Sequence, residues 1–214
     1  MTIIKGIGVS PGVAIAPAFV YIDDSGIIPQ YHISAEDVQS EMARFHEASL
    51  LAKKEIEALR DRAKKEAGEE QAAIFDAHIM MLDDPVLLEQ IELSLKEKQF
   101  NVEAAVLSFK SEMVNKLSSS QDPLKQEKVS DIHDVVRRLL GHLLKKERIS
   151  LSDIQTEIIL IAKDLLPSEM VMMSRSMVRG IVTETGSRTS HAAILARAFE
   201  IPAVLGVGPG FVQQ

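Results

Sequence analysis

The sequence contains no cysteine and no tryptophan, and aromatic residues make up only 4% of its 214 residues. Without cysteine there is no disulfide framework, no thiolate nucleophile and no zinc site built on Cys ligands. With so few aromatic rings, the chain has little material for stacking on bases or sugars. Any chemistry must therefore come from histidines, hydroxyls, amides and charged side chains.

Long apolar runs are also missing. No stretch approaches the ~18 consecutive apolar residues that indicate a membrane span, and residues 1–6 lack the basic and apolar regions of a signal peptide. We therefore expect no membrane insertion and a cytoplasmic location.

Positive charge is in deficit, with 24 Lys and Arg against 31 Asp and Glu, for a net charge of −7. Binding nucleic acid means neutralising phosphates with excess cation, so we expect no nucleic-acid partner. The same balance is compatible with a basic protein partner.

Hydrophobic residues make up 46% of the chain, enough for a sizeable core, and their pattern changes twice along it. Residues 1–22 predict strands on both sides of a turn at Ser10-Pro11-Gly12, including one over 13–16. Residues 34–146 have helical periodicity, with start signals at Ser34, at Asp84-Pro85 and at Asn101. Residues 156–208 alternate, with strands over 157–162, 178–183 and 202–205 and helices from Pro167 and over 188–199.

The simplest assembly joins the first and third zones into one α/β domain. Its predicted boundaries are 1–22 plus 148–214, with the chain possibly truncated at its carboxyl end. Residues 34–146 then form a large all-α helical-bundle insertion.

The most informative segment is 183–197, Thr-Glu-Thr-Gly-Ser-Arg-Thr-Ser-His-Ala-Ala-Ile-Leu-Ala-Arg, between a predicted strand and a predicted helix. A helix amino terminus favours anions, and Arg188 can bind phosphate oxygens bidentately. The neutral imidazole of His191 is a nucleophile at neutral pH. The hydroxyls of Ser187, Thr189 and Ser190, and the permissive backbone of Gly186, complete an anion site with a candidate nucleophile. The residues alone also allow a structural histidine at a helix start.

Several segments resemble a known family. Residues 186–197, followed by Glu-Ile-Pro-Ala at 200–203 and Gly206, resemble the phosphohistidine motif of Enzyme I of the sugar phosphotransferase system. Residues 10–14, 70–84 and 164–168 resemble its amino-terminal strand-turn, a helix of its insertion and its Asp-Leu-x-Pro-Ser loop. The resemblance covers nearly the whole chain in the right order.

This resemblance implies an α/β phosphohistidine (swivelling) domain with the helical insertion. It implies that His191 accepts a phosphoryl group that originates from phosphoenolpyruvate and passes it to the phosphocarrier protein HPr. Residues 186–190 would then hold the phosphoryl group. Mg²⁺, phosphoenolpyruvate and the dimer contact belong to a carboxyl-terminal domain that is expected to follow, so this segment is expected to hold no metal or cofactor.

The helical insertion is where that family docks HPr. The residues that the resemblance places on or near the dock are Glu69, Glu70, Phe75, Asp76, His78, Met81, Asp83, Asp84 and Lys128. Core packing is the competing interpretation for the apolar members, and a solvated face is the competing one for the acidic members.

Two positions depart from the family pattern. Ser187 stands where the family usually has a second Gly, which predicts a stiffer loop and an extra hydroxyl near the phosphoryl group. Leu166 stands where a Thr often hydrogen-bonds the imidazole, which leaves that orienting bond in doubt.

Two alternatives remain open from the sequence. One is the phosphohistidine domain of a pyruvate phosphate dikinase or phosphoenolpyruvate synthase, although those are not expected to have this amino-terminal strand or insertion. The other is a non-catalytic helical interaction module whose His191 loop merely binds an anion.

Overall fold

A computed structural model describes residues 3–22, 28–118, 123–145 and 151–212. The described residues fall into two compact units. The α/β unit comprises those within 1–24, 62–72 and 149–214, and the helical unit those within 25–61 and 73–148. The boundary expected near 146–148 lies outside the described residues.

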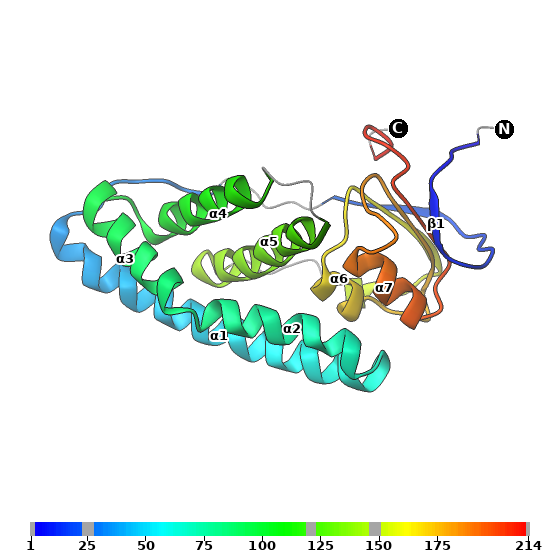
Figure 1. Cartoon of the computed structure of the whole chain (residues 1–214), viewed down its shortest axis with the longest axis horizontal. Coiled ribbons are helices and arrows are strands. Elements are labelled where there is room, and N and C mark those ends of the chain that lie inside the picture. The colour runs from blue at the N-terminus through cyan, green and yellow to red at the C-terminus, as the bar shows by residue number, and fades with distance from the viewer. Residues whose placement is uncertain (1–2, 23–27, 119–122, 146–150, 213–214) are drawn as a thin grey trace. The chain divides into compact units, whose positions relative to one another are not determined.

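The α/β unit is built on one mixed sheet (Figure 1). Its strands are β1 (Ile7–Ser10), β2 (Ala18–Tyr21), β3 (Ile158–Ala162), β4 (Val178–Thr183) and β5 (Ala203–Leu205). The order across the sheet is β1-β5-β4-β3-β2, with β1 antiparallel to β5 and the other neighbours parallel. The amino-terminal strands therefore complete a sheet made mainly by the carboxyl-terminal third of the chain, as the sequence predicts.

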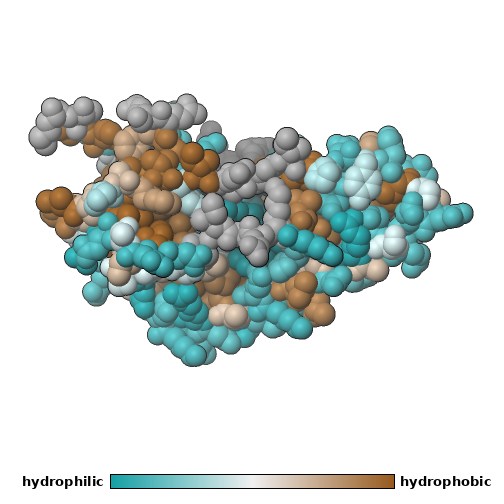
Figure 2. Space-filling view, turned by 180° about the vertical axis from the view of Figure 1, so that it is seen from behind, coloured by the Kyte–Doolittle hydropathy of each residue, from teal (hydrophilic) through white to brown (hydrophobic). Residues whose placement is uncertain are grey.

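The strand expected over residues 13–16 is wrong, because residues 11–17 carry no strand. Gly12 has a φ of +133°, outside the extended region, and a Cβ there would lie 2.6 Å from Cγ of Pro202. The turn therefore packs against the start of β5. It leaves Val13 and Ile15 91% and 92% exposed, and apolar side chains gather on the surface of this unit (Figure 2).

Two helices of this unit, α6 (Pro167–Met172) and α7 (His191–Ala198), pack against each other, and α7 also contacts β1 and β5. A 3-10 turn at Leu151–Asp153 contacts α6. The core of this unit includes apolar side chains that are at most 2% exposed, among them Leu160, Met170, Ile181, Leu195 and Leu205. The predicted helix over 188–199 begins three residues later, because Ser190 is its N-cap.

The helical elements are the 3-10 turn Ala35–Asp37, α1 (Val38–Glu66), α2 (Glu69–Leu82), α3 (Pro85–Lys98), α4 (Val102–Ser118) and α5 (Pro123–Leu143). Both α1 and α2 contribute to the two units, since the division falls inside each of them. In the helical unit the apolar stripes meet in a core that includes Phe45, Ile56, Phe75, Ile91 and Leu139.

The start signals of these helices have mixed outcomes. The Asp84 carboxylate accepts the Val86 amide and Pro85 begins α3, so that predicted cap is confirmed. The predicted cap at Asn101 is wrong in its mechanism. Its side chain instead bonds to the segment before α1, accepting from the Tyr31 amide and donating to the Pro29 carbonyl.

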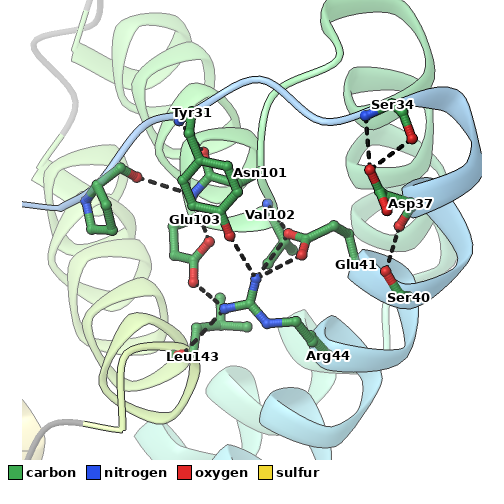
Figure 3. A network of polar contacts seen from close by, with 11 residues as sticks. Tyr31, Ser34, Asp37, Ser40, Glu41, Arg44, Asn101, Val102, Glu103 and Leu143 are labelled. Carbon is green, nitrogen blue, oxygen red and sulfur yellow. Dashed lines mark hydrogen bonds and ion pairs between the residues drawn. The ribbon is translucent and has the colours of Figure 1, made fainter.

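The amino terminus of α4 is capped from another helix (Figure 3). Glu41 of α1 accepts the Val102 amide at 2.7 Å and also receives Arg44 at 2.8 and 2.9 Å. Arg44 reaches Glu103 of α4 as well. Burial alone would lower the pKa of Arg44, but its hydrogen bonds to Glu41 and Glu103 outweigh this and raise it. The network therefore joins α1 to α4 through charged groups that satisfy each other.

Candidate functional site

The site predicted around His191 begins where β4 ends. Beyond β4 the main chain still forms hydrogen bonds with the segments that follow the two neighbouring strands, β3 and β5. The Thr185 amide donates to the Lys163 carbonyl at 3.0 Å, and the Gly206 amide donates to the Thr185 carbonyl at 3.2 Å. The Glu184 carboxylate accepts the Val212 amide at 2.8 Å. The loop therefore starts from a backbone fixed by the segments that follow β3 and β5.

Gly186 makes the turn possible. Its φ is +114°, where side chains are strained, and a Cβ there would lie 3.1 Å from Leu205 Cδ1 and 3.2 Å from its Cβ. The Gly186 carbonyl oxygen would also lie 3.2 Å from a Cβ at Gly206. The loop thus lies tightly on the end of β5, and a larger residue at 186 would push it away.

The hydroxyls of the loop bond to one another. Ser187 Oγ lies 3.1 Å from Thr189 Oγ1 and accepts the Thr189 amide at 3.3 Å, while Ser190 Oγ donates to the Ser187 carbonyl at 3.0 Å. Ser187, which stands where the family usually has a second glycine, therefore forms hydrogen bonds within the loop through its hydroxyl. It ties residues 187–190 into a compact turn, in keeping with the stiffer loop that the sequence predicts.

Ser190 and His191 form the junction of loop and helix. Ser190 has extended torsions (φ −61°, ψ 153°) and its Oγ accepts the Ala193 amide at 3.4 Å, so it is the N-cap of α7. His191 is the first residue of the helix and is partly buried. The imidazole therefore lies at the positive end of the helix dipole, which stabilises an anionic group there.

Arg188 presents its side chain to solvent, and its guanidinium group makes no hydrogen bond or ion pair with the described residues. Its main chain is held, however. Arg197, in the last turn of α7, donates from Nη1 to the Arg188 carbonyl at 3.2 Å and to the Val9 carbonyl of β1 at 3.4 Å. Sequence reasoning did not single out Arg197. Its only signal is its place in the motif that resembles Enzyme I.

The Asp164-to-Ser168 loop lies beside the same segment. The Thr185 hydroxyl donates to the Lys163 carbonyl at 3.1 Å. Burial raises the pKa of the Asp164 carboxyl, against the lowering effect of its hydrogen bonds from the Leu165 amide and the Thr185 side chain. Leu166 is the N-cap of α6 and brings no hydroxyl, so the bond that a Thr gives the imidazole in the family cannot come from this position.

Glu169 holds this second loop. Its carboxylate accepts the Leu166 amide at 2.8 Å and the Tyr21 hydroxyl at 2.7 Å. Because Tyr21 ends β2, this buried contact fixes the start of α6 to the edge of the sheet.

The structure corrects two of the docking residues expected on α2. Phe75 and His78 are 0% and 1% exposed, because they point with Leu82 into the core of the helical unit. His78 Nε2 lies 3.0 Å from the Asp131 carboxylate of α5, and its ring meets Phe75 edge-on at 5.6 Å. Neither residue is on the surface where a partner could touch it.

Three of the acidic residues expected at the dock form ion pairs with basic residues of α1. The pairs are Lys53–Asp83 at 2.6 Å, Arg60–Asp76 at 3.5 Å and Lys64–Glu69 at 2.5 Å. The hydrogen bond and charge of Lys64 lower the pKa of Glu69. A basic partner would therefore meet acidic groups that already have cationic neighbours.

The remaining expected docking residues have other surroundings. Glu70 is exposed in the first turn of α2, Asp84 is the exposed cap of α3, and Met81 is half-buried. Lys128 is exposed on α5. Among the described residues no three His, Asp or Glu side chains come together in a way that could hold a metal ion. Within those residues, no helix is both long and apolar enough to cross a membrane.

Comparison with known proteins places this architecture in a family. Residues 5–128 match the family model "PEP-utilising enzyme, N-terminal", and residues 154–213 match "PEP-utilising enzyme, mobile domain". A solved structure titled as Enzyme I superposes with a TM-score of 0.76 at 38% identity, covering 97% of this chain and 84% of that one. The amino-terminal domain of a nitrogen Enzyme 1 superposes with a TM-score of 0.62 at 26% identity, covering 95% and 83%.

The chain therefore belongs to the PEP-utilising enzymes. Within them it is similar to the amino-terminal domain of Enzyme I, as the motifs around His191 predict. The phosphoenolpyruvate-protein phosphotransferase of Bacillus subtilis is 39% identical over 203 residues, and that of Haemophilus influenzae is 37% identical over 203 residues. In both cases the match covers 95% of this chain but 35% of the relative, so the chain spans about a third of those proteins.

Proposed function

We propose that this chain is the phosphoryl-carrying part of a sugar phosphotransferase Enzyme I. The α/β unit is then a swivelling phosphohistidine domain, and His191 is the residue that carries the phosphoryl group. The observation that carries the proposal is the position of His191 at the first residue of α7, directly after the turn of residues 186–190. A helix amino terminus, loop hydroxyls and an exposed guanidinium group together suit a group with three anionic oxygens.

The chemistry is a transfer between two imidazoles. A nitrogen of His191, which we take to be Nε2, attacks phosphorus in line, a P–N bond to His191 forms, and the P–N bond of the donor histidine breaks. In the forward direction the phosphoryl group leaves His191 for HPr. The side chain of Arg188 and the amides at the start of α7 stabilise the charge on the phosphoryl oxygens during transfer.

The original donor is phosphoenolpyruvate, used with Mg²⁺ in a region of the enzyme outside these 214 residues. These residues alone are therefore expected to take no phosphoryl group from phosphoenolpyruvate. They are expected to exchange it with HPr, because donor and acceptor are both histidines.

The dock for HPr is proposed on the exposed side of α2 and its surroundings. Its acidic groups are those of Glu69, Glu70, Asp76, Asp83 and Asp84. Met81 and Lys128 are proposed to be further partner-binding residues. An acidic surface attracts a basic partner and raises the rate of encounter. Phe75 and His78 would support this surface from the core.

The test is phosphoryl transfer from phosphorylated HPr to the chain. We expect wild-type protein and His78→Ala to become labelled with an acid-labile phosphoryl group, and His191→Ala to remain unlabelled. Two-dimensional NMR of the phosphorylated protein would identify the modified nitrogen. Labelling of His191→Ala equal to that of wild type would disprove the proposal.

A further inference from the structure

The amino-terminal strand has no part in the proposed chemistry, yet it is connected to the phosphoryl loop. β1 pairs with β5, and Ser10 Oγ donates to the Ala196 carbonyl of α7 at 3.4 Å. The Val9 carbonyl, one residue earlier, accepts from Arg197. β1 therefore meets α7 at the last turn of that helix, away from His191.

Arg197 links this contact to the loop. The same atom, Nη1, that donates to Val9 also donates to the Arg188 carbonyl at 3.2 Å. One cationic group therefore binds two main-chain carbonyls that are distant in sequence. A hydrogen bond from a charged donor is stronger than a neutral one, so this contact can hold the loop in place.

The other end of the loop is held by different groups. Gly186 lies against Leu205, and the Ser187 and Ser190 hydroxyls bond within the turn. Those contacts fix the shape of residues 187–190, but they do not bind that turn to the rest of the unit at Arg188. Arg197 supplies that second point of attachment.

We propose that Arg197 is a positioning residue for phosphoryl transfer: it holds the Arg188 main chain against α7 and β1, and so places the Arg188 side chain at the phosphoryl group. The proposal rests on the function proposed above. Arg197 acts through the Arg188 carbonyl and needs no contact with the phosphoryl group.

The amino-terminal Ser-Pro-Gly turn gains a role from this arrangement. Gly12 packs on Pro202 and so holds the end of β1 beside β5. The Val9 carbonyl is thereby presented to Arg197. β1 is then a support for the site, which accounts for a motif that the phosphoryl chemistry does not use.

The test measures single-turnover transfer from phosphorylated HPr and HPr affinity separately, using the 214-residue chain. Arg197→Met keeps an unbranched side chain but removes every donor. We expect its transfer rate to fall between about tenfold and about a hundredfold, as for a small misplacement of a catalytic group. HPr affinity should stay unchanged, because the dock lies on other residues. Arg197→Lys keeps the charge and should recover part of the rate.

A matched control and a structural readout complete the design. Arg179→Met removes an exposed arginine of β4 and should leave transfer unchanged. In Arg197→Met the amide signals of residues 188–190 should shift or broaden, and millimolar guanidinium should restore some of the rate. If wild type is labelled and Arg197→Met transfers at the wild-type rate, the positioning role is wrong. If wild type itself is not labelled, the proposed function is wrong instead. An Arg197→Met variant that is merely unfolded would show a lowered thermal midpoint and no guanidinium rescue, and this outcome would also count against the role.

Discussion

Lys53 Nζ and the Asp83 carboxylate lie 2.6 Å apart, which pairs a base of α1 with an acid of the proposed dock. Both side chains are partly exposed, at 32% and 54%. Such a pair contributes only about 0–1 kcal/mol to stability. Its larger effect is on the electrostatic field that a partner meets, because the Lys53 cation cancels negative charge at the end of α2.

We therefore expect Lys53→Gln to raise the affinity for HPr, and to raise it more at low salt, where screening is weak. Lys54→Gln is the matched control: it makes the same charge change at an exposed neighbour that forms no ion pair with the described residues of α2. Titrations at two ionic strengths measure both. Equal effects of the two variants would show that only net charge matters and that the pair does not.

Arg188→Ala should slow phosphoryl transfer while leaving HPr affinity nearly unchanged. Losing one charged contact to the transition state typically costs a few kcal/mol, or about a hundredfold or more in rate. Rapid-quench measurement of the labelled fraction over time gives the rate directly. A normal rate in this variant would make Arg188 a structural residue.

Gly186→Ala should be destabilising and should also slow transfer. A residue with a side chain is strained at a φ of +114°, by roughly 1–2 kcal/mol, and its Cβ would press on Leu205. Gly208→Ala is the control, because its φ of +101° brings the same kind of strain with no atom within 4 Å. Chemical denaturation should show a larger loss at 186, and a loss at 208 of the same size would contradict the packing argument.

Asp164→Asn should change how stability depends on pH. Burial raises the folded-state pKa of Asp164 above its ordinary value of 3.8. The folded state thus holds this proton more tightly than the unfolded state, so stability is full below 3.8 and falls as the pH rises through the folded pKa. The variant lacks this decline, so above that window it should be more stable than wild type. The gain should stay below about 1 kcal/mol, because the carboxyl group is mostly covered while the rest of the residue faces solvent, which screens the effect. Thermal midpoints at pH 3.5 and pH 7 check this, and a gain that is largest at the lower pH would have the wrong sign.

Glu41→Ala should destabilise the helical unit. It removes the acceptor of the Val102 amide and one partner of Arg44, so a loss of about 2–3 kcal/mol is expected. Glu41→Gln keeps an acceptor and should lose less. Urea denaturation measures both, and equal losses would mean that the cap contributes nothing beyond the charge.

The sequence predicts the elements well where local signals decide them. Asp84 before Pro85 is a local start signal for a helix, and the short apolar run at 158–162 is typical of a buried strand, so both elements follow from the residues alone. The prediction of a strand over 13–16 is wrong because the backbone conformation of Gly12 and its contact with Pro202 depend on packing between segments that are distant in sequence. Asn101 fails as a cap for a similar reason, since Glu41 reaches α4 from another helix.

The sequence likewise predicts the part of the site that is continuous in the chain, but not the contacts that the fold brings together. The run from Gly186 to His191 is continuous in sequence, so its placement at a helix start could be inferred from periodicity and capping. Arg197 is linked to Arg188 and Val9 only through the fold, and single-sequence patterns do not report such contacts. Phe75 and His78 show the opposite limit: helical spacing identifies a face of α2, but it does not say whether that face points inward.

The pairing of β1 with β5 brings together segments that are far apart in the sequence, with Ile7 opposite Leu205. Contacts so distant in sequence form slowly, because the intervening chain must first be brought together at a cost in entropy. We expect the helices, whose contacts are local, to fold early and the β1–β5 ladder to form last. Since β1 brings the Val9 carbonyl to Arg197, the phosphoryl loop would reach its final position only in that last step. During synthesis, a chain in which β5 is still inside the ribosome would then have a folded bundle but an unfinished site.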